Sequence, residues 1–493
     1  MTSPPAANSL TVPGANGNPT TFTLADDTLV ILRAGEKKWP RIDTPVRNVV
    51  WAEVSDSVLE ISFIARRRKK HALSLVHITG RIKDDQVQLA TAFATSLLDA
   101  AYAGVKRHRR LRVFVNPKSG PGASVSHYLK RVEPIFQAAR CVIETTFTQH
   151  PRHAQDLVRD LDVDQYDAVV TMSGDGLIHE VVNGFAEHAL PERALSIPIA
   201  PIPTGSGNGL CINLLGVEDG YDVCAAALNA VKGQPLRIDL CSITQNDTRI
   251  YSFMSQVVGL FAIVDLGTEY LRFLGSTRFL VGYVIEVLKL KPCPVKLSVQ
   301  VVESDKKRMV ENLHAYQARA RAKTSGATVP DADTSSLAAA STVVASPLPD
   351  SKATSAPASP LDDGWITFDK PMSYVYAGKG PYVSKDFMQF PVSLPDDGLV
   401  DVVAQEITTR KAMLDAMDGS ENGDSYWLST QHYWKARAYR VEPLTSKSCL
   451  SVDGEAYPFE PFQVECHREM ATVLSPCGYY QAQFDLPQDS TSS

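Results

Sequence analysis

The pattern of hydrophobic and polar positions changes twice along the chain. From about residue 21 to residue 105, short segments alternate apolar or β-branched residues with polar ones, as in Thr28–Leu32, Val58–Ile64 and Ala72–Val76. A period of two is typical of antiparallel strands with one buried face. The stretch ends in a segment whose apolar residues recur at helical spacing, namely Val87, Ala90, Phe93, Ala94, Leu97 and Leu98. We therefore expect a small domain of short antiparallel strands that is closed by one C-terminal helix.

Between residues 106 and 238 the pattern becomes an alternation of buried strands and helices. Three apolar runs, Leu111–Val115, Ala168–Met172 and Ile197–Ile202, each lead into a glycine-rich turn, and helical patterns follow around Val125–Ala139 and Leu177–Phe185. Strands that alternate with helices predict an open parallel α/β sheet. Ligands of such sheets bind beyond the carboxyl ends of the strands, where the three glycine turns are expected to lie.

From residue 239 to residue 487 strand patterns dominate again and predict an antiparallel β-sandwich domain. The expected strands include Tyr251–Val258, Val295–Val302, Trp365–Phe368, Tyr374–Ala377 and Leu399–Val403. One long amphipathic segment, Tyr270–Lys289, interrupts them. Residues 305–362 are rich in Ala, Ser, Thr, Pro and Asp without periodic apolar content, which predicts a disordered insertion. Residues 1–20 and 488–493 are expected to be disordered tails.

The predicted fold class is therefore α/β plus β, in three domains. Residues 21–105 are expected to form a small β domain similar to a pleckstrin homology (PH) domain. An open α/β nucleotide-binding domain is expected at 106–238, and the β-sandwich domain, with its insertion, at 239–487.

Composition bears on the compartment of the protein and on its possible binding partners. The chain has 493 residues and a formal net charge of −6, so no global positive field favours nucleic acid. Eight cysteines without a CxxC pair fit reduced thiols in a cytosolic protein. The N-terminal segment lacks the apolar core of a signal peptide, and no apolar run approaches the roughly 18 residues of a membrane span. We expect a cytoplasmic protein that contacts membranes peripherally. The basic runs Arg66–Lys70 and Lys106–Arg110 are either solvated loops or a patch that touches anionic lipid.

Candidate chemistry lies in the three glycine turns, Asn116–Gly122, Ser173–Gly176 and Pro203–Gly209. Glycines let backbone N–H groups approach phosphate oxygens closely, and the N-terminus of a following helix points its N–H groups the same way. The first turn lacks the GK[ST] ending of a P-loop and is a weak signal alone. Three such turns in one half of the chain are much stronger evidence for a phosphate site.

Asp175 is the candidate catalytic residue. It stands between Gly174 and Gly176 at the end of a predicted strand, where an acid has little steric cover. One interpretation is an Asx-type turn, in which the carboxylate only accepts local N–H bonds. The functional interpretation is a carboxylate that orients a substrate hydroxyl and takes its proton late in the reaction. Glu180 and Asn183 follow on the helix and can brace the turn or reach a ligand.

The strings NPKSGPG, SGDGLIHEVVNG and PTGSGNGL, in this order and spacing, resemble the first three conserved blocks of the diacylglycerol-kinase catalytic superfamily. A fourth block, in which Asp265-Leu-Gly-Thr-Glu269 precedes Arg272, Gly275 and Arg278-Phe279, resembles the sphingosine-kinase signature, and Asp453-Gly-Glu455 resembles the last block. The resemblance covers residues 110–305 and 363–480. It implies a diacylglycerol-kinase/NAD-kinase-like fold and a lipid kinase that moves the γ-phosphate of ATP, with Mg²⁺, to the primary hydroxyl of sphingosine, dihydrosphingosine or phytosphingosine.

The resemblance also implies a role for each matching residue, and Asp175 corresponds to the catalytic residue that accepts the hydroxyl proton. Arg272 and Arg278 match a clamp that neutralises charge on the transferred phosphoryl group. Nucleotide contacts are implied for Asn116, Pro117, Lys118, Ser119, Gly120, Thr148, Ser173, Gly174, Gly176, Glu180, Gly205, Ser206, Gly207, Asn208, Arg272, Arg278, Asp453, Gly454 and Glu455. Ser255 and Asp265 match the lipid head-group site, where a buried carboxylate pairs with the sphingoid ammonium. The metal ligands are not assigned.

Two lipid kinases with other substrates are the nearest alternatives. Ceramide kinases resemble the chain in the fourth block but depart from GSGN in the third, which is intact at Gly205–Asn208. Diacylglycerol kinases lack the arrangement from Asp265 to Arg278. NAD kinase shares the core but has GGDG where this chain has SGDG. An inactive scaffold is disfavoured because Asp175 and both arginines of the clamp are present.

Two further segments have open interpretations. Residues 271–290 carry apolar side chains at helical spacing, either as a core helix or as a flap over an acyl-chain tunnel whose tip enters a membrane. Ser346-Pro347 and Ser359-Pro360, inside the insertion, are either substrates of proline-directed kinases or plain linker. The sequence also leaves a homodimer open.

Overall fold

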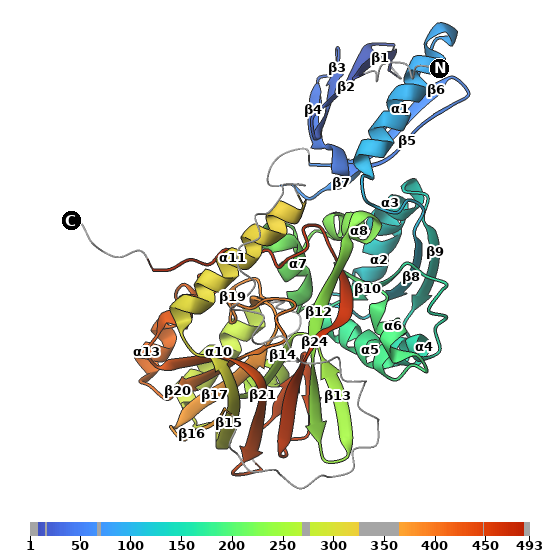
Figure 1. Ribbon diagram of the computed structural model, residues 1–493. Coiled ribbons are helices and arrows are strands. Elements are labelled where there is room, and N and C mark those ends of the chain that lie inside the picture. The colour runs from blue at the N-terminus through green and yellow to red at the C-terminus, as the bar shows by residue number, and fades with distance from the viewer. Residues whose placement is uncertain are drawn as a thin grey trace, which may run out of the picture.

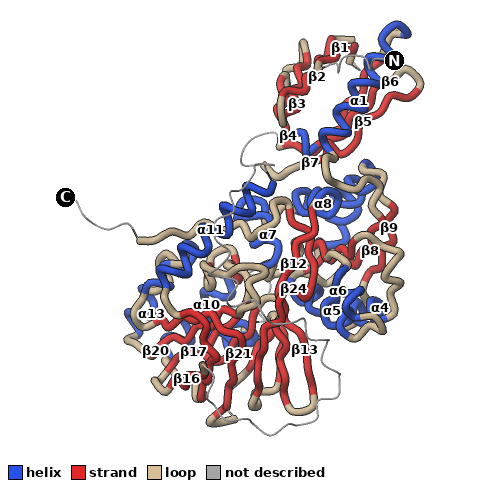
Figure 2. Tube along the Cα trace, viewed as in Figure 1, coloured by secondary structure: helices blue, strands red, loops and turns tan. Residues whose placement is uncertain are grey.

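The computed structural model has an N-terminal β domain at one end and a larger body in which an α/β part adjoins a strand-rich part (Figure 1). Helices surround the α/β strands, whereas strands make up most of the C-terminal part (Figure 2). The residues that the structure describes are 8–14, 17–66, 71–268, 277–324, 364–446 and 448–487.

The N-terminal domain consists of two antiparallel sheets and one helix. Its elements are β1 (Ser9–Pro13), β2 (Pro19–Ala25), β3 (Thr28–Arg33), β4 (Arg41–Pro45), η1 (Val46–Asn48), β5 (Val49–Ser55), β6 (Val58–Ala65), β7 (Ser74–Arg81), η2 (Asp84–Gln86) and α1 (Val87–Ala101). The first four strands form one sheet in chain order, and β5, β6 and β7 form the other. Phe22 of the first sheet packs against Phe93 of α1, with ring centroids 6.4 Å apart. The periodicity of the sequence predicts this arrangement of short strands followed by a closing C-terminal helix.

The expectation of a disordered tail over residues 1–20 is wrong where the structure describes that segment. Residues 9–13 form β1, and residues 19 and 20 begin β2. Leu10 and Val12 alternate with exposed neighbours and are 2% and 1% exposed, so β1 buries an apolar face like the other strands of its sheet. Residues 1–7 lie outside the described part of the chain.

The α/β part contains the expected parallel strands. Its elements are β8 (Arg110–Val115), α2 (Ser124–His127), the π-helical turn η3 (Tyr128–Val132), α3 (Glu133–Ala138), β9 (Val142–Phe147), α4 (His153–Arg159), β10 (Ala168–Ser173), α5 (Asp175–Ala186), α6 (Pro191–Ser196), β11 (Ile199–Pro203), α7 (Gly209–Asp219) and α8 (Val223–Lys232). The strand order is β9-β8-β10-β11, and all three pairings are parallel. The carboxyl ends of β8, β10 and β11 therefore lie at one edge of the sheet.

The strand-rich part is joined to the α/β sheet by strand pairing. Its elements are β12 (Gln234–Gln245), β13 (Thr248–Ser252), β14 (Ser255–Gly259), α9 (Leu260–Gly267), α10 (Thr277–Lys289), β15 (Val295–Glu303), α11 (Lys306–Thr324), β16 (Trp365–Phe368), β17 (Met372–Gly378), β18 (Tyr382–Ser384), β19 (Phe387–Met388), β20 (Val400–Glu406), α13 (Arg410–Asp415), η5 (Ser420–Asn422), η6 (Asp424–Trp427), β21 (Gln431–Pro443), β22 (Leu450–Val452), β23 (Glu455–Tyr457) and β24 (Phe462–Ser475). The last strand, β24, pairs with β11 in parallel and with β12 and β21 in antiparallel fashion.

As a result, the described strands of the two parts, except β18 and β19, which pair with each other, form one mixed sheet of 15 strands rather than a parallel sheet and a separate sandwich. The strands of the C-terminal part enclose an apolar core of their own, to which Val258, Leu297, Val402 and Val464 contribute from four different strands. The predicted boundary between residues 238 and 239 falls inside β12, which continues through it, although its pairing with β24 shifts register between Ile238 and Leu240.

The predicted disordered insertion over residues 305–362 is wrong for its first third. Residues 306–324 form α11, and Met309, Val310 and Leu313 of this helix are at most 3% exposed. These three side chains join an apolar cluster with Tyr426 and Phe484, so α11 is packed against the C-terminal part. Residues 325–362, with both Ser-Pro pairs, lie outside the described part of the chain.

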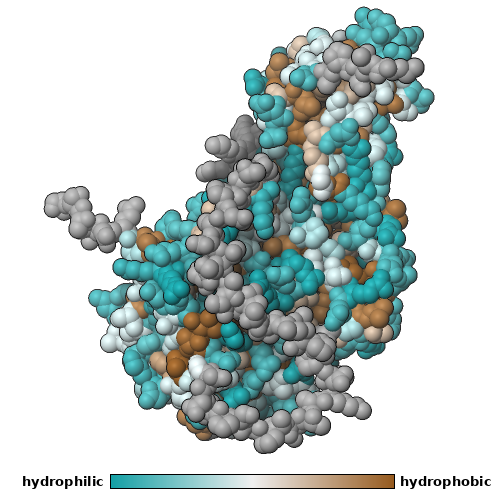
Figure 3. Space-filling model, in the orientation of Figure 1, coloured by the Kyte–Doolittle hydropathy of each residue, from teal (hydrophilic) through white to brown (hydrophobic). Residues whose placement is uncertain are grey.

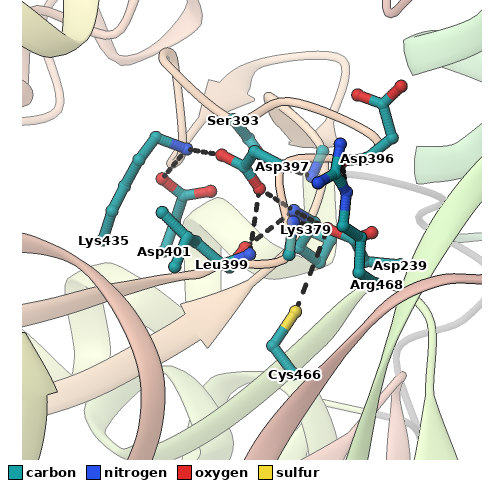
Figure 4. A network of polar contacts seen from close by, with 12 residues as sticks. Asp239, Lys379, Ser393, Asp396, Asp397, Leu399, Asp401, Lys435, Cys466 and Arg468 are labelled. Atoms are coloured by element: carbon teal, nitrogen blue, oxygen red, sulfur yellow. Dashed lines mark hydrogen bonds and ion pairs between the residues drawn. The ribbon is translucent and has the colours of Figure 1, made fainter. Parts of the chain in front are cut away.

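A network of buried charges holds the C-terminal strands together (Figure 4). The ammonium of Lys379 donates to Asp239 at 2.8 Å, to Asp397 at 2.7 Å and to the Leu399 carbonyl at 2.7 Å. Lys435 donates to the other oxygen of Asp397 at 2.8 Å. Burial works against charge at Asp397, but the two ammonium groups lower its pKa to about 2. These contacts connect β12, β17 and β21 through ionised groups away from solvent.

The surface shown in Figure 3 is mainly hydrophilic, and the cysteines form no disulfides. On the face shown in Figure 3, hydrophobic residues form small patches within a mainly hydrophilic surface. All eight cysteines are free thiols. No helix in the described ranges combines the length and the apolar content needed to cross a membrane.

Candidate active site

The three glycine turns meet at the carboxyl ends of β8, β10 and β11. A Cβ on Gly174 would lie 2.4 Å from the carbonyl oxygen of Gly207, and one on Gly205 would lie 2.3 Å from the Cα of Gly174. A Cβ on Gly120, whose φ is +51°, would lie 2.4 Å from the carbonyl oxygen of Thr204. Real Cβ atoms do not approach other atoms so closely, so the glycines allow the three backbones to touch. Turns predicted separately from the sequence thus form one surface.

Small polar side chains connect the turns. The Ser173 hydroxyl lies 3.2 Å from the Ser119 hydroxyl and 3.4 Å from the amide nitrogen of Asn116. The Thr204 hydroxyl lies 3.4 Å from Ser119 and 3.3 Å from Ser124. Each turn therefore contributes a hydroxyl or an amide to one cluster, together with the N–H groups of a helix N-terminus. This arrangement provides neutral hydrogen-bond donors suited to phosphate oxygens.

Asp175 is the first residue of α5 and is 5% exposed. Its carboxylate accepts hydrogen bonds from the N–H groups of Gly209 at 2.7 Å and Leu210 at 3.2 Å, which begin α7. Burial raises the pKa of Asp175, the two N–H groups oppose the shift, and the carboxylates of Asp453 and Asp265 add to it, so that the pKa is about 6. The group is thus a carboxylate at neutral pH whose basicity exceeds that of an ordinary Asp.

Asp453 lies between β22 and β23 and is 2% exposed. One of its oxygens accepts from the Ser252 hydroxyl at 2.6 Å and from the Met254 and Ser255 N–H groups at 3.1 and 2.8 Å. The other accepts from the Phe253 N–H at 3.2 Å. The residue has φ of +50°, and its own N–H donates to the Ser255 carbonyl at 2.8 Å. Its carboxylate thus holds the turn between β13 and β14 beside the site.

His179 links this anchor to the helix that carries Asp175, and sequence reasoning did not single it out. Its Nδ1 lies 2.8 Å from Asp453 and its Nε2 lies 2.9 Å from the Tyr457 hydroxyl. Because a carboxylate can only accept, Nδ1–H donates to Asp453 and a neutral ring then accepts from Tyr457. The side-chain amide of Asn183, on the same helix, donates to the Tyr251 carbonyl and accepts from the Tyr251 N–H, both at 2.9 Å. Asn183 therefore braces α5, which is one of the two roles that the sequence suggests for it.

Asp265 lies on α9 on the C-terminal side of the site and accepts a 2.6 Å hydrogen bond from the Ser451 hydroxyl. The adjacent Tyr376 is hydrogen-bonded to Ser255, and burial, followed by the nearby charge of Asp265, raises the pKa of the Tyr376 phenol. Since Asp265 also raises the pKa of Asp175, the two carboxylates belong to one electrostatic environment. Phe261, one turn earlier on α9, stacks on Tyr283 at 5.5 Å and meets Tyr374 edge-on at 4.7 Å, so an apolar aromatic cluster borders this acid.

Other residues implicated by the sequence differ in their contacts and exposure. Glu455 is exposed, and its carboxylate oxygen lies 2.8 Å from where a Cβ on Gly176 would stand, next to Asp175. Glu180 accepts from the Ala154 N–H at 3.1 Å and so binds the N-terminus of α4. Lys118 is exposed, whereas Arg278 on α10 is 6% exposed.

The remaining predicted site residues are part of the turns themselves or next to them. Thr148 follows β9, and its N–H donates to the Val115 carbonyl at 2.8 Å. Asn208 closes the third turn through hydrogen bonds with Gly205 of 2.8 and 3.1 Å. Pro117, Ser206 and Gly454 lie in the first turn, the third turn and the turn before β23. Arg272 lies outside the described residues.

The chain is similar to several known proteins. A family model described as the diacylglycerol kinase catalytic domain matches residues 110–243, and one described as a domain of unknown function matches residues 14–103. A solved structure described as a putative diacylglycerol kinase from Bacillus anthracis covers 75% of this chain and 98% of its own, with a TM-score of 0.49 and 17% identity.

The fold and the three-turn site thus define a kinase with a diacylglycerol-kinase-type catalytic domain. Sphingoid long chain base kinase 4 of Schizosaccharomyces pombe is 30% identical over 460 residues, which are 92% of this chain and 93% of that relative. Sphingosine kinase 1 of Homo sapiens is 27% identical and covers 75% of this chain and 91% of itself. The chain belongs to the sphingoid long-chain base kinase family.

Proposed function

We propose that the protein transfers the γ-phosphoryl group of ATP to the primary hydroxyl of a sphingoid long-chain base. The observation that carries the proposal is Asp175, a buried carboxylate at the meeting point of three glycine turns and within the electrostatic reach of Asp265. Membership of the sphingoid long-chain base kinase family supports both the reaction and the class of substrate.

In this reaction the chain's own residues bind, orient and accept a proton. The glycine turns and their hydroxyls hold the phosphates, and Asp175 hydrogen-bonds the attacking hydroxyl and takes its proton as the oxygen–phosphorus bond forms. Arg278, with Arg272, is proposed to neutralise charge on the phosphoryl group. The two N–H groups of α7 orient the Asp175 carboxylate.

The proposed cofactor is ATP with Mg²⁺, which would neutralise phosphate charge when bound. No group of three or more His, Cys, Asp or Glu side chains with metal-binding geometry occurs among the described residues. The oxygens of Asp453 accept from protein donors, and the Glu455 carboxylate lies at the surface beside Gly176. Because Mg²⁺ in kinases is commonly held by one or two carboxylates plus substrate phosphates, Glu455 is the residue that fits this role.

Asp265 is proposed to select the sphingoid base. A carboxylate in an apolar setting is stabilised when a cation meets it, and a sphingoid base brings a protonated amine. Ceramide has an amide at that position and diacylglycerol an ester, so neither supplies the charge. The neighbouring aromatic cluster around Phe261 is the proposed wall for the apolar chain.

Paired saturation curves with sphingosine and ATP test the proposal on the wild type, Asp265→Asn and the exposed control Asp415→Asn. Asp265→Asn should raise KM for sphingosine by about 10- to 100-fold, equivalent to roughly 1.5–3 kcal/mol of a charge-assisted hydrogen bond, and leave KM for ATP unchanged. Asp415→Asn should match the wild type. Equal phosphorylation of ceramide or diacylglycerol by the wild type would leave a lipid kinase but remove the sphingoid assignment.

We further propose that α10 brings the protein to membranes, where its substrate resides. Five large apolar side chains of this helix, Leu280, Val281, Val284, Ile285 and Leu288, are between 37% and 57% exposed. An exposed apolar helix face next to basic residues such as Lys289 and Lys291 fits a peripheral contact with anionic lipid. Leu280→Ser with Leu288→Ser should reduce vesicle binding, whereas Leu444→Ser, at a still more exposed position elsewhere, should not.

The N-terminal domain is proposed to be of the PH class. Sheets of four and three antiparallel strands, closed by the C-terminal helix α1, support that architecture.

A further inference from the structure

The strand β17 carries a tyrosine, Tyr376, on the face of the sheet that borders the site. Side chains alternate along a strand, so Tyr376 lies on the opposite face from its neighbours Val375 and Ala377. Those two neighbours belong to the apolar core between the C-terminal strands. The ring of Tyr376 instead meets that of Phe261 on α9, with centroids 5.7 Å apart. The strand therefore directs Tyr376 toward the helix that carries Asp265.

The phenol of Tyr376 lies where the polar site passes into the aromatic cluster. Ser255 on β14 is opposite Gly378, two residues from Tyr376 on the same face, so the phenol reaches the Ser255 hydroxyl across a position without a side chain. The ring also meets Phe390 edge-on, with centroids 5.4 Å apart. Burial, followed by the charge of Asp265, raises the pKa of the phenol, so the group keeps its proton at neutral pH and can donate a hydrogen bond.

This part of the site is open to a ligand. Tyr376, Phe261 and Asp265 each keep part of their surface exposed, and so does Phe387. The ring of Phe387 stacks on that of Phe261 at 5.0 Å and lies 6.5 Å from that of Tyr376. Aromatic side chains that meet one another and are each partly exposed border a common opening, which here lies next to Asp265.

The polar groups beside this opening outnumber those that all sphingoid bases share. Every such base has a hydroxyl on C1, an amine on C2 and a hydroxyl on C3. The proposed function, on which this inference rests, assigns the C1 hydroxyl to Asp175 and the amine to Asp265, and Ser255 is the next polar residue of the head-group site. Tyr376 is a fourth polar group, beside Ser255 and toward the aromatic wall. An unsubstituted C4 offers the phenol no hydrogen bond, whereas a hydroxyl on C4 does.

We propose that Tyr376 selects long-chain bases that carry a hydroxyl on C4, by donating a hydrogen bond from its phenol to that hydroxyl. The favoured substrate is then phytosphingosine, which has the C4 hydroxyl, over dihydrosphingosine, which lacks it. Asp265 recognises the amine that both bases share, so it sets the class of lipid, and Tyr376 discriminates within that class. Tyr376 is a specificity-determining residue and takes no part in the transfer of the phosphoryl group.

Phytosphingosine and dihydrosphingosine of equal chain length differ only in the C4 hydroxyl and form a matched pair of substrates. Both are presented to the full chain at the same fraction of detergent micelles, and kcat/KM is measured for each. The wild type should favour phytosphingosine by about 3- to 10-fold, the range for one neutral hydrogen bond. Tyr376→Phe should remove this preference by lowering kcat/KM for phytosphingosine alone, and KM for ATP should stay the same.

Tyr283→Phe is the matched control for the loss of a phenol. Tyr283 belongs to the same aromatic cluster, since its ring stacks on Phe261, but its hydroxyl donates to the Met413 carbonyl at 2.7 Å. This variant should keep the wild-type ratio between the two bases, whatever its effect on turnover. Circular dichroism shows whether each variant folds. Should Tyr376→Phe fail to fold, Tyr376→Met, which keeps an apolar side chain in the wall, takes its place.

Equal kcat/KM of the wild type for the two bases would overturn the proposal without any variant. An equal loss for both bases in Tyr376→Phe would overturn it too, because the phenol would then meet a group that both bases share. Loss of the preference in Tyr283→Phe as well would show that selectivity does not depend on the Tyr376 phenol. Transfer to neither base would reject the proposed function itself, whereas equal transfer to both rejects only the role of Tyr376.

Discussion

The carboxylate of Asp175 is placed where a buried acid destabilises the fold but serves catalysis. Burial and two neighbouring acids raise its pKa from 3.8 to about 6, so the folded protein binds this proton more tightly than the unfolded chain does. The contribution of this group to stability therefore falls as the pH rises from about 4 to about 6. Above that window the residue is an ionised base with a pKa closer to working pH than that of an ordinary Asp, which favours proton transfer.

We expect kcat/KM to fall as the pH drops below about 6, because protonation of Asp175 removes the base. Asp175→Asn should lower kcat by about 100-fold or more and leave the affinity for ATP nearly unchanged. At neutral pH this variant should be at least as stable as the wild type, because a neutral amide replaces a buried charge. The measurements are pH–rate profiles and urea denaturation, with the exposed Asp160→Asn as control. Near-normal turnover of Asp175→Asn would exclude the catalytic assignment.

The glycine turns and Asp175 could be predicted from the sequence because each is a local strand–turn–helix unit. The role of Asp453 could not, because its partners are distant: Ser252 lies 201 positions earlier and His179 lies 274 positions earlier. The resemblance implied a nucleotide contact for Asp453, whereas its position in the structure is that of an anchor for the turn between β13 and β14. The string that contains His179 was recognised, but a histidine on a helix does not reveal which carboxylate it meets.

At the scale of elements, the helix α11 is not predicted from the sequence because its apolar face is narrow. Its 19 residues are mostly polar or charged, and only Met309, Val310, Leu313 and Tyr316 supply an apolar stripe. The low-complexity segment that follows it dominates the composition of residues 305–362, so the whole range looks disordered. Packing against Tyr426 and Phe484, which are distant in sequence, stabilises the helix.

Leu313→Ala should lower the free energy of unfolding by about 2–5 kcal/mol, because Leu313 is 3% exposed within the cluster that joins α11 to the C-terminal part. Leu444→Ala, at a position 69% exposed, should change it by about 0.5 kcal/mol or less. Urea denaturation of both variants measures the difference. Equal stability of the two would mean that α11 does not pack in solution.

The stability of the strands around Lys379 depends on pairing each buried carboxylate there with an ammonium group. Lys379→Met should cost about 3–5 kcal/mol, because it leaves Asp239 and Asp397 buried without their shared cation. Lys370→Met, which breaks an exposed pair with Glu406, should cost about 1 kcal/mol or less. Denaturant midpoints of the two variants provide the comparison. A small loss for Lys379→Met would show that water or rearrangement compensates the carboxylates.

At the scale of the whole molecule, the sequence predicts the order of the three parts but not how they are joined. The α/β part and the strand-rich part share a sheet because β24, the last strand, returns to pair with β11. The N-terminal domain shares an apolar core with the outer face of the α/β part, in which Leu97 of α1 and Val231 of α8 belong to one cluster. Such contacts between distant segments leave no periodic signal, since each strand or helix carries the same apolar pattern whatever it packs against.

Lys232, the last residue of α8, is the polar centre of the junction with the N-terminal domain. It is 1% exposed, and its ammonium donates to the carbonyl oxygens of Val49 and Ala101 and lies 3.9 Å from the centre of the Tyr102 ring. These contacts favour the ammonium form. Burial, with repulsion from Arg47 and Arg107, nevertheless lowers the pKa of Lys232 from 10.5 to about 7.

The junction should therefore become more stable as the pH rises above 7. Between about pH 7 and about pH 10 the unfolded chain keeps the proton that the folded protein has released, so the free energy of unfolding increases with pH, by up to about 2 kcal/mol from pH 7 to pH 9. Lys232→Met removes the titrating group and should abolish this part of the increase. Urea denaturation of the wild type, Lys232→Met and the exposed control Lys106→Met at the two pH values measures it. If Lys232→Met kept the pH dependence of the wild type, Lys232 would remain charged at the junction, and the two carbonyls and the Tyr102 ring would compensate its burial in full.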